Sequence, residues 1–170
     1  MAIRWFVKLY VVRHAIAEER NPEAWPDDDI RPLTERGIRR FRKAALGLER
    51  LVPEVDLVLA SPKVRAWDTA VILNEEAGWP EPVACDALRD SEPLAVLQAL
   101  EAYTELGSLA IVGHEPYLGR LLAFLLRAEA GTAFELRKGG AASLYLEGLS
   151  ETSLSSLKWS LSPKILRALA

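Results

Sequence analysis

At 170 residues the chain is long enough for one domain to bury about two-thirds of the surface that it exposes when unfolded. Its 21 basic and 24 acidic residues give a formal net charge of −3, so neither nucleic acid nor an anionic membrane is an expected partner. The single cysteine, Cys85, excludes an intramolecular disulfide and a cysteine-rich zinc site. No apolar run approaches the ~20 residues that span a bilayer, and residues 1–8 contain no secretory signal. We therefore expect one cytoplasmic domain covering residues 1–170.

The first predicted element is a short apolar strand, Leu9 to Val12, that ends abruptly in Arg13 and His14. The run is too short for a helix, and its β-branched side chains favour a buried strand. A polar stretch with two prolines, residues 18–29, follows and predicts a loop at the mouth of a crevice.

Two helices with clear start signals come next. Thr34 is a good N-cap for a helix whose apolar residues recur at three- and four-residue steps until Pro53 ends it. A second strand, residues 56–60, leads into Ser61 and Pro62. Serine as N-cap with proline at the first helical position predicts that the second helix begins here.

The remaining chain continues to alternate. Residues 81–89 are ambiguous, with a short strand around 83–85 as one interpretation. The pattern then predicts a helix over 94–100, a strand over 109–112, a helix from Pro116, a turn at 138–140, strands over 142–147 and 156–161, and a short helix from Pro163. Strands that alternate with helices indicate an α/β fold with three layers, α/β/α, around a mainly parallel central sheet.

Polar side chains follow three of these strands. Arg13 and His14 end the first strand, Arg65 lies just beyond the second, and His114 follows the third. In open α/β sheets ligands bind at the carboxyl ends of the strands, so these side chains are expected to meet. Arginine presents a planar fork that matches phosphate oxygens, and helix N-termini add backbone N–H groups. The sequence therefore predicts a phosphoryl site.

A histidine in such a site has two possible jobs. A neutral imidazole can attack phosphorus and form a phosphoenzyme, or it can donate a hydrogen bond to the group in transfer. Neighbouring arginines should lower the pKa of the attacking ring. The chain has no P-loop frame, no G-x-S-x-G elbow, and Ser91 instead of arginine six residues after Cys85. Asp27 to Asp29 is interpreted as an acidic loop, because zinc usually needs three or four clustered ligands.

Three motifs together resemble a known family. They are Arg13-His14, Ser61-Pro62 with Arg65-Ala66 and Thr69-Ala70, and Gly113-His114-Glu-Pro116, and they resemble the histidine phosphatase superfamily, also called phosphoglycerate-mutase-like. The short length, the run from Arg31 to Gly37 and the Lys138-Gly-Gly140 turn resemble the SixA-type phosphohistidine phosphatases. The resemblance implies that His14 is the nucleophile that becomes phosphorylated. It also implies a phosphoryl pocket of Arg13, Arg65 and His114, flanked by Arg31, and catalysis without metal or cofactor.

One departure from the family pattern bears on the substrate. Members that hydrolyse phosphomonoesters use a carboxylic acid as proton donor, whereas this chain offers only Asp90 and Glu92, which suit helix capping equally well. A positioned acid raises the reaction rate roughly 10²–10⁴-fold when the leaving group is an alkoxide. The imidazole of phosphohistidine leaves more readily than an alkoxide. We therefore expect a phosphatase that acts on phosphohistidine in a protein. The alternatives are a phosphatase for small phosphomonoesters, with Asp90 or Glu92 as acid, and a non-catalytic phosphate-binding module.

Overall fold

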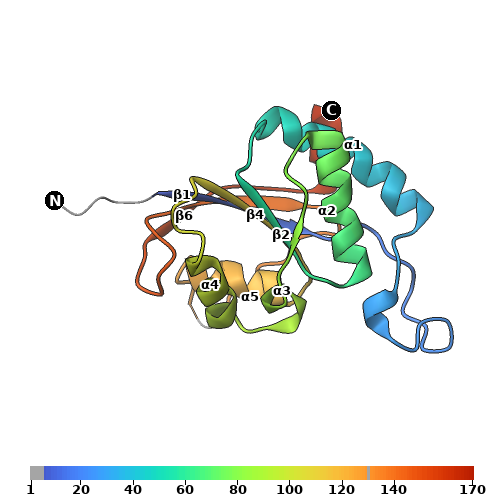
Figure 1. The fold of residues 1–170 in the computed structure, drawn as a ribbon, viewed down its shortest axis with the longest axis horizontal. Coiled ribbons are helices and arrows are strands. Elements are labelled where there is room, and N and C mark those ends of the chain that lie inside the picture. The colour runs from blue at the N-terminus through green and yellow to red at the C-terminus, as the bar shows by residue number, and fades with distance from the viewer. Residues whose placement is uncertain (1–5, 130) are drawn as a thin grey trace.

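The computed structural model describes residues 6–129 and 131–170, which form an α/β fold around a six-stranded sheet (Figure 1). The strand order is β3-β2-β4-β1-β5-β6. The strands are β1 (Val7–Arg13), β2 (Leu57–Ala60), β3 (Val83–Ala84), β4 (Ser108–Gly113), β5 (Ala141–Leu146) and β6 (Ser155–Leu161). β1, β2, β3 and β4 run parallel to one another, and β5 and β6 are antiparallel to their neighbours. The prediction of a mainly parallel sheet is confirmed.

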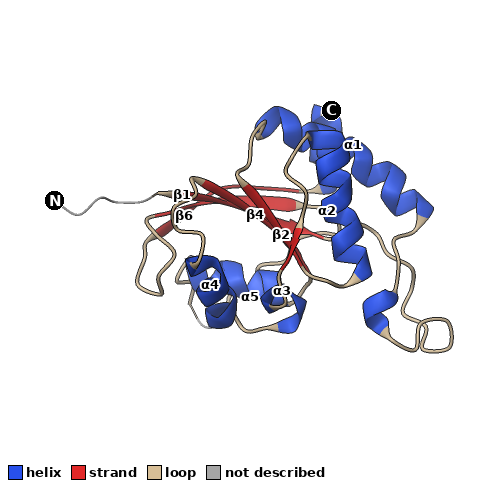
Figure 2. Cartoon of the chain, viewed as in Figure 1, coloured by secondary structure: helices blue, strands red, loops and turns tan. Residues whose placement is uncertain are grey.

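Helices cover both faces of this sheet, which gives the three expected layers (Figure 2). One face carries α1 (Glu35–Leu51), α2 (Val64–Ala77) and α6 (Pro163–Leu169), and the other carries α3 (Ala87–Asp90), α4 (Pro93–Glu101) and α5 (Tyr117–Leu125). A short 3-10 helix, η1 (Asp28–Ile30), ends the loop predicted over residues 18–29.

The central strand β1 sends alternate side chains into two separate cores. Tyr10 and Val12 pack in the cluster that contains the buried faces of α1, α2 and α6. Leu9 and Val11 pack in the cluster that contains the buried faces of α4 and α5. Because both faces of a parallel sheet are covered, its central strands are apolar without alternation. This burial explains the continuous apolar run that ends at Arg13.

The start of α1 agrees with the sequence prediction, and the start of α2 does not. Thr34 Oγ1 accepts a hydrogen bond from the backbone N–H of Gly37 at 2.8 Å and caps α1. The predicted cap of α2 at Ser61 is wrong, because Lys63 occupies the N-cap position. Ser61 directly follows β2 and stays paired with β4, since its N–H donates to the carbonyl oxygen of Val112 at 2.9 Å.

Two glycines allow α1 to approach its neighbours closely. A Cβ atom at Gly37 would collide with the carbonyl oxygen of Ile16, and one at Gly47 would collide with that of Leu166 in α6. The first turn of α1 thus packs against the segment that follows His14, and its second half packs against α6.

Two predictions concern membranes and export. Within residues 6–129 and 131–170, no helix is long and apolar enough to cross a bilayer. The predicted lack of a secretory signal falls mainly on residues 1–5, which lie outside the described residues.

Candidate active site

The parallel pairing of β1 with β4 brings the two histidines together. Arg13 lies opposite Gly113 in the register, so His14 and His114 follow at the same edge of the sheet. The backbone N–H of His14 donates to the carbonyl oxygen of Gly113 at 3.0 Å. The ring centroids are 5.2 Å apart, and the side chains are buried, with exposed fractions of 5% and 4%. The two buried imidazoles are therefore neighbours.

The backbone decides which nitrogen of His14 can react. Nδ1 lies 2.6 Å from the carbonyl oxygen of Ala15. Because a carbonyl oxygen only accepts, Nδ1 of the neutral ring carries the proton and Nε2 keeps its lone pair. The N–H of Ala15 donates to Thr69 Oγ1 at 3.0 Å, and that hydroxyl donates to the carbonyl oxygen of Arg65 at 2.7 Å. The segment after His14 is thus tied to α2, with Nε2 as the candidate nucleophilic atom.

Burial keeps His14 neutral. Burial is the main reason that the pKa of His14 falls from 6.5 to about 3. The hydrogen bond to Ala15 raises this pKa, whereas the charges of Arg65, Arg13 and Lys138 lower it further. The arginines act in the direction expected from the sequence. Burial is the larger cause, and the sequence reasoning did not include it. At pH 7 the ring has a free electron pair on Nε2.

Ser61 lies against the second histidine. Its Oγ is 2.8 Å from Nε2 of His114, and the same oxygen accepts a hydrogen bond from the backbone N–H of Lys63 at 3.4 Å. A hydroxyl that accepts from Lys63 can still donate its own proton to Nε2, and in that arrangement the ring proton of His114 lies on Nδ1. Burial is the main reason that the pKa of His114 falls to about 2. The charges of His14, Arg65 and Lys63 lower this pKa further, and the charge of Asp28 raises it. The second imidazole is therefore a neutral donor through Nδ1.

Arg65 reaches the pocket from the first turn of α2 and is held by η1. Its Nη1 donates to the carbonyl oxygen of Asp28 at 2.7 Å, and its Nη2 donates to Oδ2 of the same residue at 2.9 Å. Only 5% of the residue is exposed. The two terminal nitrogens thus fix the guanidinium plane and leave its Nε edge available.

Arg13 is held in a similar way by the segment before β5. Its Nη1 donates to the carbonyl oxygen of Leu136 at 2.5 Å and to Glu135 Oε1 at 3.4 Å. Among the described residues, the buried side-chain nitrogens and oxygens without a partner are Nε of Arg13, Nε of Arg65 and Nδ1 of His114. Buried polar groups in proteins are nearly always satisfied. Three unpaired donors on residues near His14 are therefore groups that an anion with several oxygens would satisfy.

The fifth predicted residue, Arg31, lies one step further out. Its Nε donates to Asp28 Oδ1 at 2.8 Å and its Nη1 to the carbonyl oxygen of Glu18 at 2.7 Å. Burial alone raises the pKa of Asp28, but the hydrogen bond from Arg31 and the charges of Arg65, Arg31 and Arg20 outweigh it and hold the pKa below 3.8. Arg31 thus flanks the pocket through an ionised carboxylate that it shares with Arg65.

Asp28 is the site residue that the sequence reasoning missed. The sequence predicts only an acidic loop over Asp27 to Asp29, yet Asp28 orients Arg65. The available signal was three consecutive acids in a loop that faces strand ends rich in arginine. Across the described ranges, no group of three or more histidine, cysteine, aspartate or glutamate side chains could hold a metal ion. The chemistry of the pocket is that of cationic and neutral donors, which suits an anion.

The two candidate acids are exposed and are not bonded to the predicted site residues. Asp90 is the exposed last residue of α3, and Glu92 is the exposed N-cap residue of α4. Glu92 forms an ion pair with Arg120 at 3.0 Å and makes no capping hydrogen bond. Within the described residues, neither carboxylate has a hydrogen bond or ion pair with Arg13, Arg65 or the histidines.

Comparison with known proteins agrees with this geometry. A family model described as the histidine phosphatase superfamily, branch 1, matches residues 9–92, the part of the chain that carries Arg13, His14 and Arg65. The chain belongs to the histidine phosphatase superfamily. It is accordingly a phosphatase, and the predicted membership of that family is confirmed.

Individual relatives match this chain over most of its length. An uncharacterized protein of Picosynechococcus is 33% identical over 142 residues, which cover 81% of this chain and 84% of the relative. The phosphohistidine phosphatase SixA of Escherichia coli is 28% identical over 163 residues, 92% of this chain and 94% of the relative.

Solved structures confirm the phosphoglycerate-mutase-like fold. The protein histidine phosphatase SixA, complexed with tungstate, has 26% identity and a TM-score of 0.79 and covers 94% of this chain and 99% of that chain. A mycobacterial glucosyl-3-phosphoglycerate phosphatase with inorganic phosphate has 17% identity and a TM-score of 0.70, with coverage of 92% and 98%, and shows the fold alone.

Proposed function

We propose that this phosphatase hydrolyses phosphohistidine on a protein, through a phosphoenzyme on His14 and without metal or cofactor. The observation that carries the proposal is the presentation of an unprotonated Nε2 of His14 among three unpaired donors from Arg13, Arg65 and His114. Positioned donors of this kind stabilise a phosphoryl group as its charge spreads over its oxygens.

The reaction has two steps. In the first, the Nε2 lone pair of His14 forms a bond to phosphorus as the bond from phosphorus to the substrate imidazole breaks. The substrate imidazole leaves as a neutral ring, because its other nitrogen already carries a proton. In the second step, water attacks phosphorus, the bond to His14 breaks, and the products are inorganic phosphate and a proton.

The states of Asp28, Asp90 and Glu92 support phosphohistidine over an ester as the substrate. Asp28, which bonds to Arg65, has a lowered pKa and is ionised at neutral pH, so it has no proton to give. Asp90 and Glu92 are exposed, and Glu92 is paired with Arg120. Hydrolysis of an ester without a proton donor is slower by a factor of roughly 10²–10⁴. A protonated imidazole can leave without such a donor.

The relatives support the same substrate class. The Escherichia coli relative is named a phosphohistidine phosphatase, and the similar solved structure is a protein histidine phosphatase.

Cys85 makes no disulfide. A free thiol suits a reducing compartment, and we propose the cytoplasm as the location.

A substrate panel tests the proposal. The purified enzyme is given a histidine-phosphorylated protein, sugar phosphates and nucleoside monophosphates, with and without a chelator. We expect kcat/KM for the phosphoprotein to exceed that for the esters by about 100-fold, the size of a general-acid contribution. The chelator should have no effect, and acid-labile phosphate should be trapped on wild-type enzyme and not on His14→Ala.

Two further variants separate this proposal from the small-molecule alternative. Asp90→Asn and Glu92→Gln should leave turnover of phosphohistidine unchanged. Strong preference for an ester, lost in either variant, would instead identify a phosphomonoesterase with that carboxylate as acid. Full activity of His14→Ala would contradict the phosphoenzyme.

A further inference from the structure

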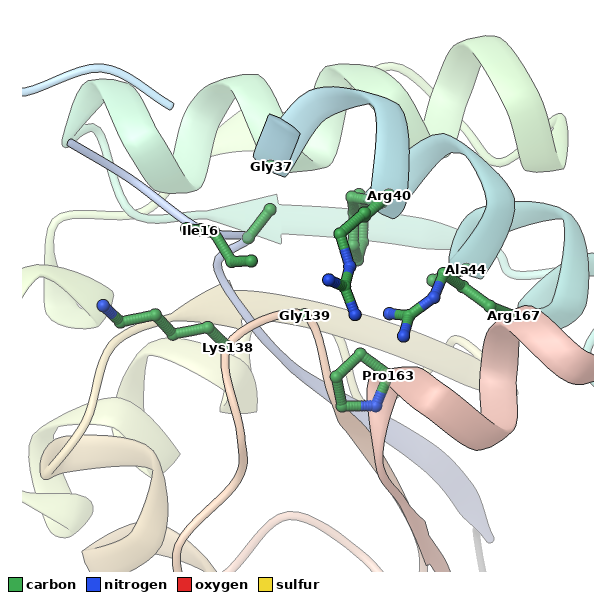
Figure 3. Close-up of a pocket in the computed structure, with 10 residues that line it drawn as sticks. Ile16, Gly37, Arg40, Ala44, Lys138, Gly139, Pro163 and Arg167 are labelled. Carbon is green, nitrogen blue, oxygen red and sulfur yellow. The ribbon is translucent and has the colours of Figure 1, made fainter. Parts of the chain in front are cut away.

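A positively charged cavity lies between α1, α6 and the turn at Lys138 and Gly139 (Figure 3). It consists of two adjacent depressions with volumes of about 50 Å³ and 520 Å³ that share Arg40, Pro163 and Arg167 as lining residues. Lys138 lines the smaller depression, and Arg137 and Lys164 line the larger one. None of the described lining residues is acidic. We call Arg40, Arg137, Lys138, Lys164 and Arg167 the cationic cavity.

The charges of the cationic cavity are not neutralised within the described part of the chain. Arg13 and Arg65 have carboxylate partners, whereas none of the five cavity residues forms an ion pair with a described carboxylate. Figure 3 shows the guanidinium groups of Arg40 and Arg167 turned toward one another above Pro163. Burial, together with the charge of Arg40, lowers the pKa of Arg167. An anion between two such groups would relieve their repulsion.

The fold holds these cations in place. Gly47 allows the backbones of α1 and α6 to come into direct contact at Leu166. Arg50 Nη1, near the end of α1, also donates to the carbonyl oxygen of Leu169 at 2.6 Å. Arg40 and Arg167 therefore project from two helices that are locked together. The backbone positions from which these two arginines reach the cavity are thus fixed relative to each other.

The cationic cavity adjoins the phosphate pocket without being part of it. Ala15 and Ile16 line the smaller depression and directly follow His14 in the chain. Gly139, another lining residue, donates its N–H to the carbonyl oxygen of His14 at 3.0 Å. The charge of Lys138 reaches His14 and contributes to its lowered pKa. His14 does not line the cavity, so the backbone around Ala15 separates the two sites.

We propose that the cationic cavity binds acidic side chains that neighbour the phosphohistidine on the protein substrate. The inference rests on the proposed function and names a feature of its substrate. Arg137, Lys138 and Lys164 are exposed, so the cations form an open surface that a protein can cover. A protein surface can cross the backbone between the sites, whereas a small monophosphate in the pocket ends before it. Arginine and lysine recognise carboxylates through charge-assisted hydrogen bonds.

Three synthetic peptides of equal length test this inference. Each contains one phosphohistidine, flanked by aspartate and glutamate, by asparagine and glutamine, or by lysine. For the wild-type enzyme at low salt we expect kcat/KM to be roughly three- to tenfold higher for the acidic peptide than for the neutral one, because the charges act at an exposed rim. The difference should lie in KM and should shrink at high ionic strength.

A matched pair of double variants assigns the effect to the cavity. Arg40→Gln with Arg167→Gln should abolish the preference for the acidic peptide and keep turnover of the neutral peptide, which also shows that the variant is folded. Arg36→Gln with Lys43→Gln removes the same charge from exposed positions of α1 outside the cavity and should keep the preference.

Three results would overturn the inference. The first is equal hydrolysis of all three peptides by the wild type, which leaves the proposed function intact. The second is a cavity variant that loses turnover of a sugar bisphosphate and keeps the preference among peptides, which would assign the cavity to a small molecule. The third is turnover of esters with none of any phosphohistidine peptide, which would remove the proposed function and this inference together.

Discussion

At the scale of single residues, each imidazole of the pocket has its proton placed by a different kind of partner. Nδ1 of His14 faces the carbonyl oxygen of Ala15, which can only accept. Nε2 of His114 faces the hydroxyl of Ser61, which can donate or accept and also accepts from the N–H of Lys63. The tautomer of His114 therefore depends on a side chain that can be replaced.

Replacement of Ser61 by alanine should disturb the reaction and leave substrate binding nearly unchanged. Without the hydroxyl, the proton of His114 distributes between both nitrogens, and a fraction of the enzyme lacks the Nδ1 donor. We expect kcat to fall roughly three- to tenfold, the worth of one hydrogen bond, with little change in KM. Separate measurement of kcat and KM, with ¹⁵N NMR of the histidines, checks both consequences.

Ser61→Thr is the control, because it keeps a hydroxyl at the same position. It should preserve the ¹⁵N signature of a His114 that is protonated on Nδ1. An unchanged kcat and an unchanged tautomer in Ser61→Ala would show that Ser61 does not position His114.

The sequence could predict which side chains meet at the strand ends, and it could not predict what orients them. Arg13, His14 and His114 each follow an apolar run that is easily recognised as a strand. Ser61 has the local chemistry of an N-cap, yet its backbone N–H bonds to Val112 of β4 and the helix begins later. Asp28 bonds to Arg65 across 37 positions of the chain, through a loop whose path no hydrophobic period encodes. The catalytic roles of the four predicted residues stay predictions.

At the scale of elements, α1 supports both sites. Its first turn contacts the segment after His14 at Gly37, and Gly47 lets it contact α6, which carries Arg167. Apolar spacing predicted this helix well, since Phe41 and Leu48 belong to one buried stripe. The same reasoning was ambiguous for β3, which consists of two exposed residues held by backbone pairing with β2.

Gly47→Ala should destabilise the protein, although alanine favours a helix. The new Cβ would collide with the carbonyl oxygen of Leu166, and α6 would have to move. Overpacking of this kind costs about 1–3 kcal/mol of unfolding free energy, which exceeds the gain of about 1 kcal/mol in helix propensity at most such sites. Urea denaturation measures the difference.

Gly107→Ala serves as the matched control. A Cβ there would lie 3.5 Å from Asp56 Oδ2, an ordinary contact, so its unfolding free energy should stay within about 0.5 kcal/mol of wild type. Equal stability of the two variants would show that the contact between α1 and α6 is not tight.

At the scale of the whole molecule, the order of elements made the layered architecture predictable. Strands that alternate with helices specify a parallel sheet covered on both faces. The structure of the segment before β5 could not be predicted in this way, because its apolar residues have no regular spacing. It nevertheless supplies Leu136 and Glu135 to Arg13 and places Lys138 beside His14. Folding then buries two neutral imidazoles together, which ties the stability of the molecule to pH.

Stability should therefore fall as pH decreases below about 6.5. Burial lowers the pKa of His14 to about 3 and that of His114 to about 2, while both titrate near 6.5 when the chain is unfolded. Between 6.5 and these folded values the unfolded chain binds protons that the folded chain does not, so each histidine removes up to about 1.4 kcal/mol of unfolding free energy per pH unit. Between pH 7.5 and 5.5 the two together should remove about 2–3 kcal/mol.

Urea denaturation at both pH values measures this loss, and His14→Asn with His114→Gln, which cannot titrate, should show little of it. A variant that loses as much stability as the wild type would place the acid sensitivity in other groups.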